Sequence, residues 1–254
     1  MTQTDKAIDR TKLLPSDPSQ QWVCTACSFN MIGFYPKRCR FCGATPEHFT
    51  TALDCSATRQ VEAVQVSDRI SQLKSAPPFD FEHAAYRIDT GNGIVWIDCP
   101  STFDSQMTPM EYILFTHYDC LGASNLYRQE FRTQVWIHQR DAVHPNSRRF
   151  SFDRTFEADF ELLGIEAVVM GGHTPGFTLY FFEDTLFLCD YVERVDSEFI
   201  WNPYGNRVKT PLVGQAVARL LSDRPTPPKT VCGVDYVEDY ESWKVKFDRL
   251  MMQT

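Results

Sequence analysis

The feature that most constrains the fold of this chain is a histidine framed by glycine and proline. An aspartate at the end of an apolar run follows it. The two segments are residues 171–176 (GGHTPG) and 186–190 (LFLCD). Glycine and proline indicate a tight turn, and the apolar run indicates a buried strand. Imidazole and carboxylate are both metal ligands. A turn carrying His173 and a strand ending at Asp190 therefore predict a metal site at the rim of a β-sandwich.

A second histidine segment lies about fifty residues upstream, at residues 115–122 (FTHYDCLG). Residues 94–100 (IVWIDCP) add an apolar run that ends in an aspartate, and residues 135–138 (VWIH) add another. Together with the two segments above, they resemble the metallo-β-lactamase superfamily over residues 61–254. That family has His-x-His-x-Asp-His, a Gly-His-Thr-Pro-Gly turn, Gly-Asp and a last histidine. The resemblance implies an α/β fold, the αββα metallo-β-lactamase-like sandwich.

The resemblance implies a reduced set of metal ligands. The matching positions hold His117, Asp119, Cys120, His173 and Asp190. Three of the five family histidines are replaced, and these replacements are Phe115, Cys120 and Val234. Two histidines and one carboxylate suit a single zinc or iron(II) with open positions, so we expect a mononuclear site.

Several functions remain open on this evidence. The first is an atypical metal-dependent hydrolase, with Asp119 as the general base or as a ligand of a second metal position. Its substrate would be a thioester, ester or phosphodiester, because the resembled superfamily hydrolyses these classes. A subordinate form is an iron-dependent thiol oxidoreductase. The alternative is a non-catalytic scaffold, in which His117 and His173 hydrogen-bond Asp119 and Asp190 in a polar network. The loss of three histidines favours the scaffold, and the retained ligands favour the enzyme.

Four N-terminal cysteines form a separate signal. They are Cys24, Cys27, Cys39 and Cys42, two Cys-x-x-Cys turns separated by a short connector. Two such turns can direct four thiolates at one tetrahedral zinc, and a module this small needs the metal in order to fold. The sequence therefore predicts a structural zinc at this zinc-ribbon or zinc-finger module.

The four-cysteine module resembles zinc fingers of the Ran-binding-protein type, although its Asn30 comes one residue early and its connector is one residue longer. The resemblance implies a protein or single-stranded RNA partner. Basic residues can contact phosphates, and aromatic residues can either stack on bases or pack the module onto the larger domain. The basic residues are Lys37, Arg38 and Arg40, and the aromatic residues are Phe29, Phe34, Tyr35 and Phe41.

Four further cysteines map to strand ends near the predicted rim: Cys99, Cys120, Cys189 and Cys232. Buried free cysteine commonly packs as a small apolar residue, although four thiols near one pocket also permit thiol or soft-metal chemistry. The other histidines, His48, His83, His138 and His144, have no evident partners in the sequence, and we interpret them as structural or surface residues.

Charge, targeting signals and cysteine content bear on the partners and the cellular compartment of this chain. The net charge of −8 argues against nonspecific binding of nucleic acid by the whole surface, although residues 1–60 carry a net charge of +2. We find no apolar run of membrane-spanning length and no signal peptide. Nine cysteines without an export signal suggest reduced thiols. These observations predict a cytoplasmic protein that does not enter a membrane.

The domain organisation follows from these segments. We expect a flexible lead at residues 1–20, the zinc finger at 21–45, a linker at 46–60 and the large domain at 61–254. Within the large domain the sequence predicts strands at 61–66, 86–89, 94–98, 112–115, 135–138, 161–170, 177–182, 185–189 and 230–232. Helices are expected at 122–131, 139–143, 212–221 and 239–252.

Overall fold

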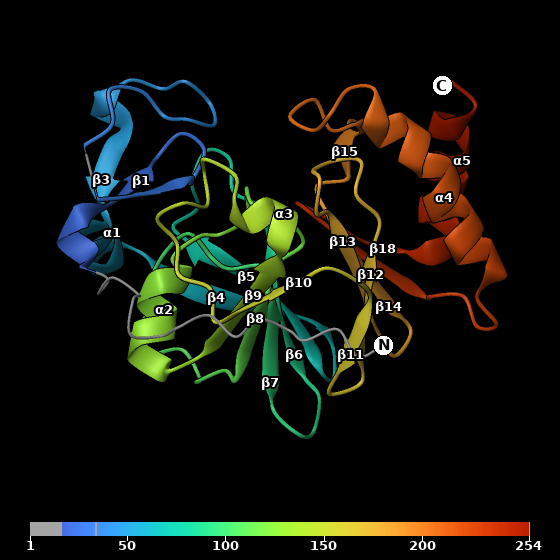
Figure 1. Cartoon of the computed structure of the whole chain (residues 1–254), viewed down its shortest axis with the longest axis horizontal. Coiled ribbons are helices and arrows are strands. Elements are labelled where there is room, and N and C mark those ends of the chain that lie inside the picture. The colour runs from blue at the N-terminus through green and yellow to red at the C-terminus, as the bar shows by residue number, and fades with distance from the viewer. Residues whose placement is uncertain (1–16, 34, 254) are drawn as a thin grey trace. The chain divides into compact units, whose positions relative to one another are not determined.

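The structure is a computed structural model that describes residues 17–33 and 35–253. The chain divides into two compact units, Met1–Phe156 and Glu157–Thr254. Figure 1 shows the ribbon. Most of the expected flexible lead, residues 1–16, lies outside the described residues. Among the described residues, no helix combines the length and the apolar character needed to cross a membrane.

The first unit is built on a seven-stranded mixed sheet with the order β10-β9-β8-β7-β6-β5-β4. Its strands are β4 (Gln60–Ser67), β5 (Ile70–Ala76), β6 (Ala85–Asp89), β7 (Ile94–Ile97), β8 (Tyr112–Leu114), β9 (Gln134–His138) and β10 (Arg154–Phe156). From β4 to β7 the pairing is antiparallel, and from β7 to β10 it is parallel. The C-terminal ends of the parallel strands meet at one edge, and this edge carries the candidate ligands of the first unit.

Helices α2 (Ser124–Phe131) and α3 (Gln139–Ala142) connect the parallel strands. Leu126 and Tyr127 of α2 belong to the same buried cluster as side chains of β7, β8 and β9. The ring of Tyr127 meets the ring of Trp96 edge to face, with centroids 4.9 Å apart. This aromatic contact fixes α2 on the sheet, and α2 follows the loop that carries the upstream histidine motif.

The four-cysteine module has its own three-stranded sheet, with the order β2-β1-β3. Its strands are β1 (Gln21–Cys24), β2 (Asn30–Ile32) and β3 (Phe49–Thr51). A 3₁₀ helix, η2 (Pro18–Gln20), precedes it, and η3 (Pro46–His48) and α1 (Ala52–Thr58) flank β3. Residues 46–60, for which the sequence predicts a linker, therefore carry regular structure. The reason is that Thr51 caps α1 by accepting from Asp54 N–H, while β3 pairs with β1.

The second unit contains a six-stranded sheet with the order β11-β12-β13-β14-β17-β18 and a separate hairpin of β15 and β16. The strands are β11 (Phe160–Leu162), β12 (Ile165–Val169), β13 (Thr178–Phe182), β14 (Thr185–Cys189), β15 (Val192–Val195), β16 (Glu198–Trp201), β17 (Thr230–Gly233) and β18 (Val237–Asp239). The run at 161–170, expected as one strand, is two strands, because Leu163 and Gly164 turn the chain with φ of 52° and 81°.

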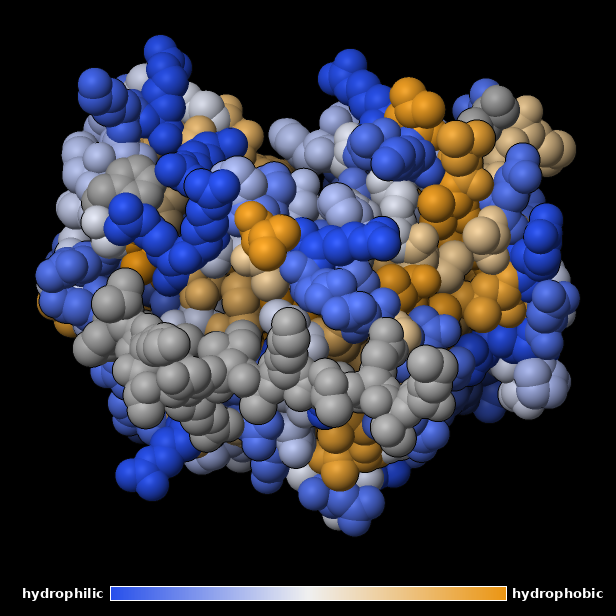
Figure 2. Space-filling view, in the orientation of Figure 1, coloured by the Kyte–Doolittle hydropathy of each residue, from blue (hydrophilic) through white to orange (hydrophobic). Residues whose placement is uncertain are grey.

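Helices α4 (Lys209–Asp223) and α5 (Tyr240–Met251) complete the second unit. Their apolar faces share a buried cluster with β13, β14 and β17, and Trp243 and Phe247 of α5 stack within it at 4.6 Å. In Figure 2, hydrophobic side chains also gather on the outer surface over α4, where Val208 and Leu212 are exposed. Each unit thus supplies one main sheet with helices packed on it, which is the composition expected of each half of an αββα fold.

Candidate metal centres

The four predicted finger cysteines lie together, and their sulfur atoms form one cluster. Cys24 Sγ is 3.7 Å from Cys42 Sγ, and Cys27 Sγ is 3.6 Å from Cys39 Sγ. Four thiolates at the Zn–S distance of about 2.3 Å would be about 3.8 Å apart in a tetrahedron. The observed spacing is close to this value, so the cluster has the dimensions of a tetrahedral zinc site.

The thiols of this cluster also perturb one another. Hydrogen bonds with Cys24 and Cys39, together with burial, raise the pKa of Cys27. Hydrogen bonds with Cys24 and Cys27 lower the pKa of Cys39 to about 2. Four sulfurs this close cannot all ionise without a cation to compensate the charge. The donor chemistry therefore fits a bound zinc ion.

Aromatic residues of the four-cysteine module stack in series. Phe29 stacks on Phe41 at 5.9 Å, and Phe41 stacks on Phe81 at 6.5 Å. Asn30 adds a hydrogen bond, in which its Nδ2 donates to the carbonyl of Ser101 at 3.2 Å. These contacts attach the module to the rest of the first unit, and they occupy the rings of Phe29 and Phe41. Tyr35 stays exposed, and Phe34 lies outside the described residues.

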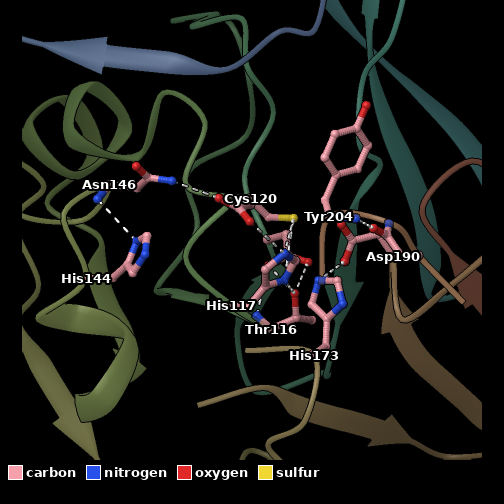
Figure 3. A network of polar contacts seen from close by, with 11 residues as sticks. Thr116, His117, Cys120, His144, Asn146, His173, Asp190 and Tyr204 are labelled. Atoms are coloured by element: carbon pink, nitrogen blue, oxygen red, sulfur yellow. Dashed lines mark hydrogen bonds and ion pairs between the residues drawn. The ribbon is translucent and has the colours of Figure 1, made fainter. Parts of the chain in front are cut away.

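In the first unit, His117 lies three residues beyond the end of β8, and a chain of hydrogen bonds fixes its ring (Figure 3). Thr116 N–H and Oγ1–H both donate to Asp98, at 2.9 Å to Oδ1 and 2.8 Å to Oδ2. His117 Nδ1 is 3.0 Å from Thr116 Oγ1. Because the single hydroxyl proton of Thr116 goes to Asp98, the imidazole must donate from Nδ1. In the neutral ring the lone pair is then on Nε2, the state that a metal ligand requires.

Two further expected ligands surround His117. Cys120 Sγ lies 3.8 Å from Nδ1 and 3.9 Å from Nε2 of the ring. Asp119 Oδ2 is 4.0 Å from His117 Nε2, and Asp119 Oδ1 accepts from Asn146 Nδ2 at 3.1 Å. The first unit therefore brings His117, Asp119 and Cys120 together, and metal binding by these residues stays a prediction. Neither Thr116 nor Asn146 was identified by sequence reasoning.

In the second unit, the Gly-Pro turn holds His173. Gly171 and Gly172 have φ of 65° and 87°, which favour glycine, and a Cβ on Gly172 would lie 2.7 Å from Val213 Cγ2. Asn206 N–H donates to the carbonyl of His173 at 3.0 Å. A Cβ on Gly205 would lie 2.3 Å from His173 Nδ1, so glycine at this position allows the 202–206 loop to approach the ring closely.

Asp190 follows β14 and faces His173. Its Oδ1 is 3.3 Å from His173 Nε2, and the two side chains are 8% and 1% exposed (Figure 3). The preceding residue, Cys189, has a left-handed φ of 46°, a conformation that costs free energy for a residue with a Cβ. This backbone bend ends β14 and turns the chain at Asp190. The second unit therefore brings together its two expected ligands.

Two positions that are histidine in the resembled family belong to the apolar core here. Phe115 is fully buried and contacts Phe152 edge to face at 6.3 Å. Val234 is 1% exposed. Neither side chain can bind a metal, so these two positions supply no ligand.

The remaining cysteines and histidines have ordinary structural surroundings. Cys99 is fully buried, and burial raises the pKa of its thiol. Cys232 is fully buried in β17. His83 Nε2 lies 2.8 Å from the carbonyl of Cys99, and His138 Nδ1 caps α3 by accepting from Arg140 N–H. His144 stacks on Tyr118 at 3.7 Å, and burial lowers its pKa.

Comparisons with known proteins identify the fold. No protein-family model and no curated protein sequence matches the chain. Among solved structures, it is similar to the metallo-β-lactamase DIM-1, with a TM-score of 0.59 and 12% identity over 77% of this chain and 99% of that one. It is also similar to FIM-1 from Pseudomonas aeruginosa in its mono-zinc form, with a TM-score of 0.56 and 10% identity over 76% and 95%.

A third similar structure is TTHA1623 in a di-iron-bound form, with a TM-score of 0.51 and 20% identity over 73% of this chain and 98% of that one. At these identities the likeness concerns the fold alone. The chain has the metallo-β-lactamase fold, as the sequence resemblance predicted, preceded by a cluster of four cysteines.

Proposed function

We propose that this chain is a metal-dependent hydrolase with a reduced, mononuclear site and, separately, a structural zinc in the four-cysteine module. His117, His173 and Asp190 are the proposed ligands of the hydrolytic metal, and Cys120 is an additional ligand. Asp119 is the proposed general base. This assignment of ligands rests on the family pattern, in which these residues occupy matching positions.

The observation that carries the proposal is the His173–Asp190 pair. Both side chains are buried, and the imidazole and carboxylate lie 3.3 Å apart at the end of β14. Burying a carboxylate costs free energy unless a cation or hydrogen bonds compensate it. A strained residue, Cys189, precedes Asp190, and strain of this kind concentrates at functional sites. The Thr116–His117 contact adds support, because it presents Nε2 as a donor of electrons.

When bound, the metal would supply a nucleophilic water by lowering the pKa of that water towards neutrality. Asp119 would accept the proton from this water. Its carboxylate is oriented for that role by Asn146, which donates to Oδ1 and leaves Oδ2 on the side of His117. Thr116 would keep His117 in the metal-binding tautomer throughout.

The metal is zinc or iron(II) in this proposal. Two imidazoles and a carboxylate suit both ions. The similar structures include one in a mono-zinc form and one in a di-iron-bound form. The iron form keeps the thiol oxidoreductase as a subordinate possibility, and oxygen consumption with a thiol substrate would distinguish it from hydrolysis.

Metal content per chain tests the proposal. Elemental analysis of the wild type is expected to give two metals. Cys39→Ser/Cys42→Ser is expected to lose one of them, and His173→Ala the other. The wild type should hydrolyse a generic thioester, ester or phosphodiester, and His173→Ala should lower that rate at least about 100-fold. A strong chelator should abolish the rate, and added zinc or iron(II) should restore it.

A second candidate is the non-catalytic scaffold, which the apolar residues at the family's ligand positions favour. Phe115 and Val234 are both buried, so two ligand positions belong to the core. If the wild type binds one zinc that disappears in Cys39→Ser/Cys42→Ser, and hydrolyses none of the three substrate classes, the hydrolase proposal is wrong. The four-cysteine module would then be the interaction element, with a protein or single-stranded RNA partner.

A further inference from the structure

A pocket of about 250 Å³ lies within the first unit, between the four-cysteine module and the loop at residues 145–150. The wall from the module includes Arg40 and residues 29–32, and the other wall includes Arg148 and Arg149. The pocket is separate from the residues proposed to bind the hydrolytic metal. Its walls come from segments more than one hundred residues apart in the sequence, so only the folded chain forms it.

Reciprocal arginine contacts hold the two walls together. Arg40 Nη1 donates to the carbonyl of Pro145 at 3.2 Å, and Arg149 Nη1 donates to the carbonyl of Gly33 at 3.2 Å. Gly33 has a φ of 76°, which favours glycine, and the end of the Arg149 side chain lies against it, 2.5 Å from where a Cβ would be. These two contacts position Arg40 and Arg149 at the walls of the pocket.

The lining has a strong charge bias. Among the described residues that line it are three arginines and no aspartate or glutamate. This contrasts with the whole chain, whose net charge is −8. Phe150 is buried and adds apolar surface to the lining, while the ring of Phe29 is stacked on Phe41. Such a lining suits a ligand with an anionic group and a flat apolar part.

The number of arginines favours a phosphoryl group over a carboxylate. A phosphate monoester presents three oxygens and close to two negative charges, and each guanidinium can bind phosphate oxygens in a bidentate manner. A small ligand is also favoured over single-stranded RNA. Binding of RNA relies on a groove along the backbone and on available aromatic faces. Phe29 and Phe41 are already stacked in series with Phe81.

We infer that this pocket binds a small molecule bearing a phosphoryl group, held by Arg40, Arg148 and Arg149. The inference is independent of the proposed hydrolytic metal. The pocket nevertheless adjoins that site's proposed general base, because Asn146 lines the pocket and donates to Asp119 Oδ1 at 3.1 Å. A bound phosphate ester thus contacts the residue that orients Asp119.

Calorimetric titration of the full chain tests the inference. The probes are adenosine 5′-monophosphate and pyrophosphate, with adenosine, citrate and octauridylate as comparisons. The two phosphoryl probes are expected to bind with one ligand per chain, and adenosine is not expected to bind. Arg148→Gln should weaken binding about tenfold, and Arg40→Gln/Arg148→Gln about 100-fold. Arg132→Gln, an exposed arginine elsewhere in the same unit, is the matched control and should leave affinity unchanged.

The zinc content of each variant shows whether its four-cysteine module is still folded. If Arg40→Gln lowers the zinc content, Arg148→Gln alone provides the test, because Arg148 lies outside the module. Equal affinities for Arg148→Gln and Arg132→Gln would place the ligand elsewhere. Equal binding of citrate would refute the assignment to a phosphoryl group. If octauridylate binds and neither small phosphoryl probe does, the pocket is an RNA contact and the inference is wrong. If no probe binds at millimolar concentration, the inference is also wrong.

Discussion

At the scale of single residues, Thr116 determines how His117 can act. Its hydroxyl donates to Asp98, and its oxygen lies 3.0 Å from His117 Nδ1. A metal-binding histidine commonly donates its other ring N–H to such a partner, which fixes the tautomer and the ring orientation. Asp98 is itself held in a left-handed conformation with φ of 59° at the end of β7. The orientation of His117, a proposed ligand, thus depends on two residues outside the proposed ligand set.

Replacement of Thr116 tests this dependence. Thr116→Val keeps the shape of the side chain and removes the hydroxyl, so the zinc affinity of the proposed site should fall about 10–100-fold. Competition with a chromogenic chelator, in a Cys39→Ser/Cys42→Ser background that leaves one site, measures this affinity. Thr116→Ser retains the hydroxyl and is the control. Equal affinities for the valine and serine variants would show that the hydroxyl has no role.

The buried carboxyl of Glu82 should make the stability of the first unit depend on pH. Burial raises the pKa of its carboxyl above the ordinary value of 4.5, although it accepts from Ser75 N–H and Oγ–H at 3.0 and 2.6 Å. The folded state therefore holds this proton more tightly than the unfolded chain. The resulting stabilisation is fully present below the ordinary pKa and is lost as the pH rises through the raised pKa.

The Glu82→Gln variant isolates this effect, because glutamine cannot ionise. The free energy of unfolding of the wild type, relative to that of Glu82→Gln, should be greatest at pH 4, where the buried carboxyl is neutral and no charge is buried. The difference should narrow as the pH rises to 7. Urea unfolding at several pH values measures it, and a difference that stays constant with pH would contradict the prediction.

The positions of the candidate ligands could be predicted from the sequence better than the residues that support them. His117, His173 and Asp190 lie in short motifs whose turn and strand signals are local, so their positions could be read from neighbouring residues. Asn146 supports Asp119 from 27 positions away, and no local pattern marks such a contact. Gly205 was missed for the same reason. Glycine is needed there only because the folded loop brings this position close to the ring of His173.

At the scale of elements, the 202–206 loop packs closely against the His173 turn. The backbone N–H of Asn206 donates to His173 O, and Gly205 lies where a Cβ would collide with the imidazole. The loop leads directly into α4, which is fixed on the sheet of the second unit by its apolar face. The ring of His173 is therefore positioned by the turn on one side and by this loop on the other.

Gly205→Ala should displace the imidazole and lower zinc affinity of the proposed site at least about tenfold, because a shift of one ångström at a ligand costs much of its binding. Gly214→Ala in α4 is a matched control. Its Cβ would meet Met251 Sδ and Trp201 Cη2 at 2.6 Å, so it should destabilise the second unit without reaching His173. Chelator competition gives the affinities, and thermal unfolding gives the stabilities. Loss of zinc in both variants alike would indicate general destabilisation.

Elements with a clear apolar alternation or period were predicted well. The hairpin of β6 and β7, the strands β8 and β9, and helices α4 and α5 match the expected segments within a few residues. The strands β10, β15 and β16 were not predicted, because they are three or four residues long and are partly exposed. Their pairing with neighbours, rather than their own composition, makes them strands.

At the scale of the whole molecule, the chain combines a slightly basic first sixty residues with an acidic remainder. The three arginines of the 250 Å³ pocket lie in the first unit, one of them in the four-cysteine module. The module also belongs to that unit by its packing, through the series Phe29–Phe41–Phe81 and the Asn30–Ser101 hydrogen bond. If the four-cysteine module binds the proposed zinc, that metal would stabilise one wall of the pocket.

Removal of the proposed zinc should destabilise the four-cysteine module and leave the 157–254 unit folded. In Cys39→Ser/Cys42→Ser the four-cysteine module loses the binding free energy that orders it, since so small a module buries too little apolar surface. Limited proteolysis should then cut within residues 21–45 much faster than in the wild type, while the 157–254 unit stays resistant. Mass spectrometry of the fragments identifies the cut sites. Equal resistance of the two proteins would show that packing alone maintains the module.

The pairing of β3 with β1 has a practical consequence for dividing this protein into fragments. β3 lies within residues 46–60, where the sequence predicts a linker, yet it forms one edge of the cysteine-bearing sheet. An expression fragment that stops at residue 45 would remove that edge strand and leave the backbone of β1 exposed to pairing with other chains. A fragment that begins at residue 61 would remove β3 and α1 as well. Neither boundary separates two intact folding units.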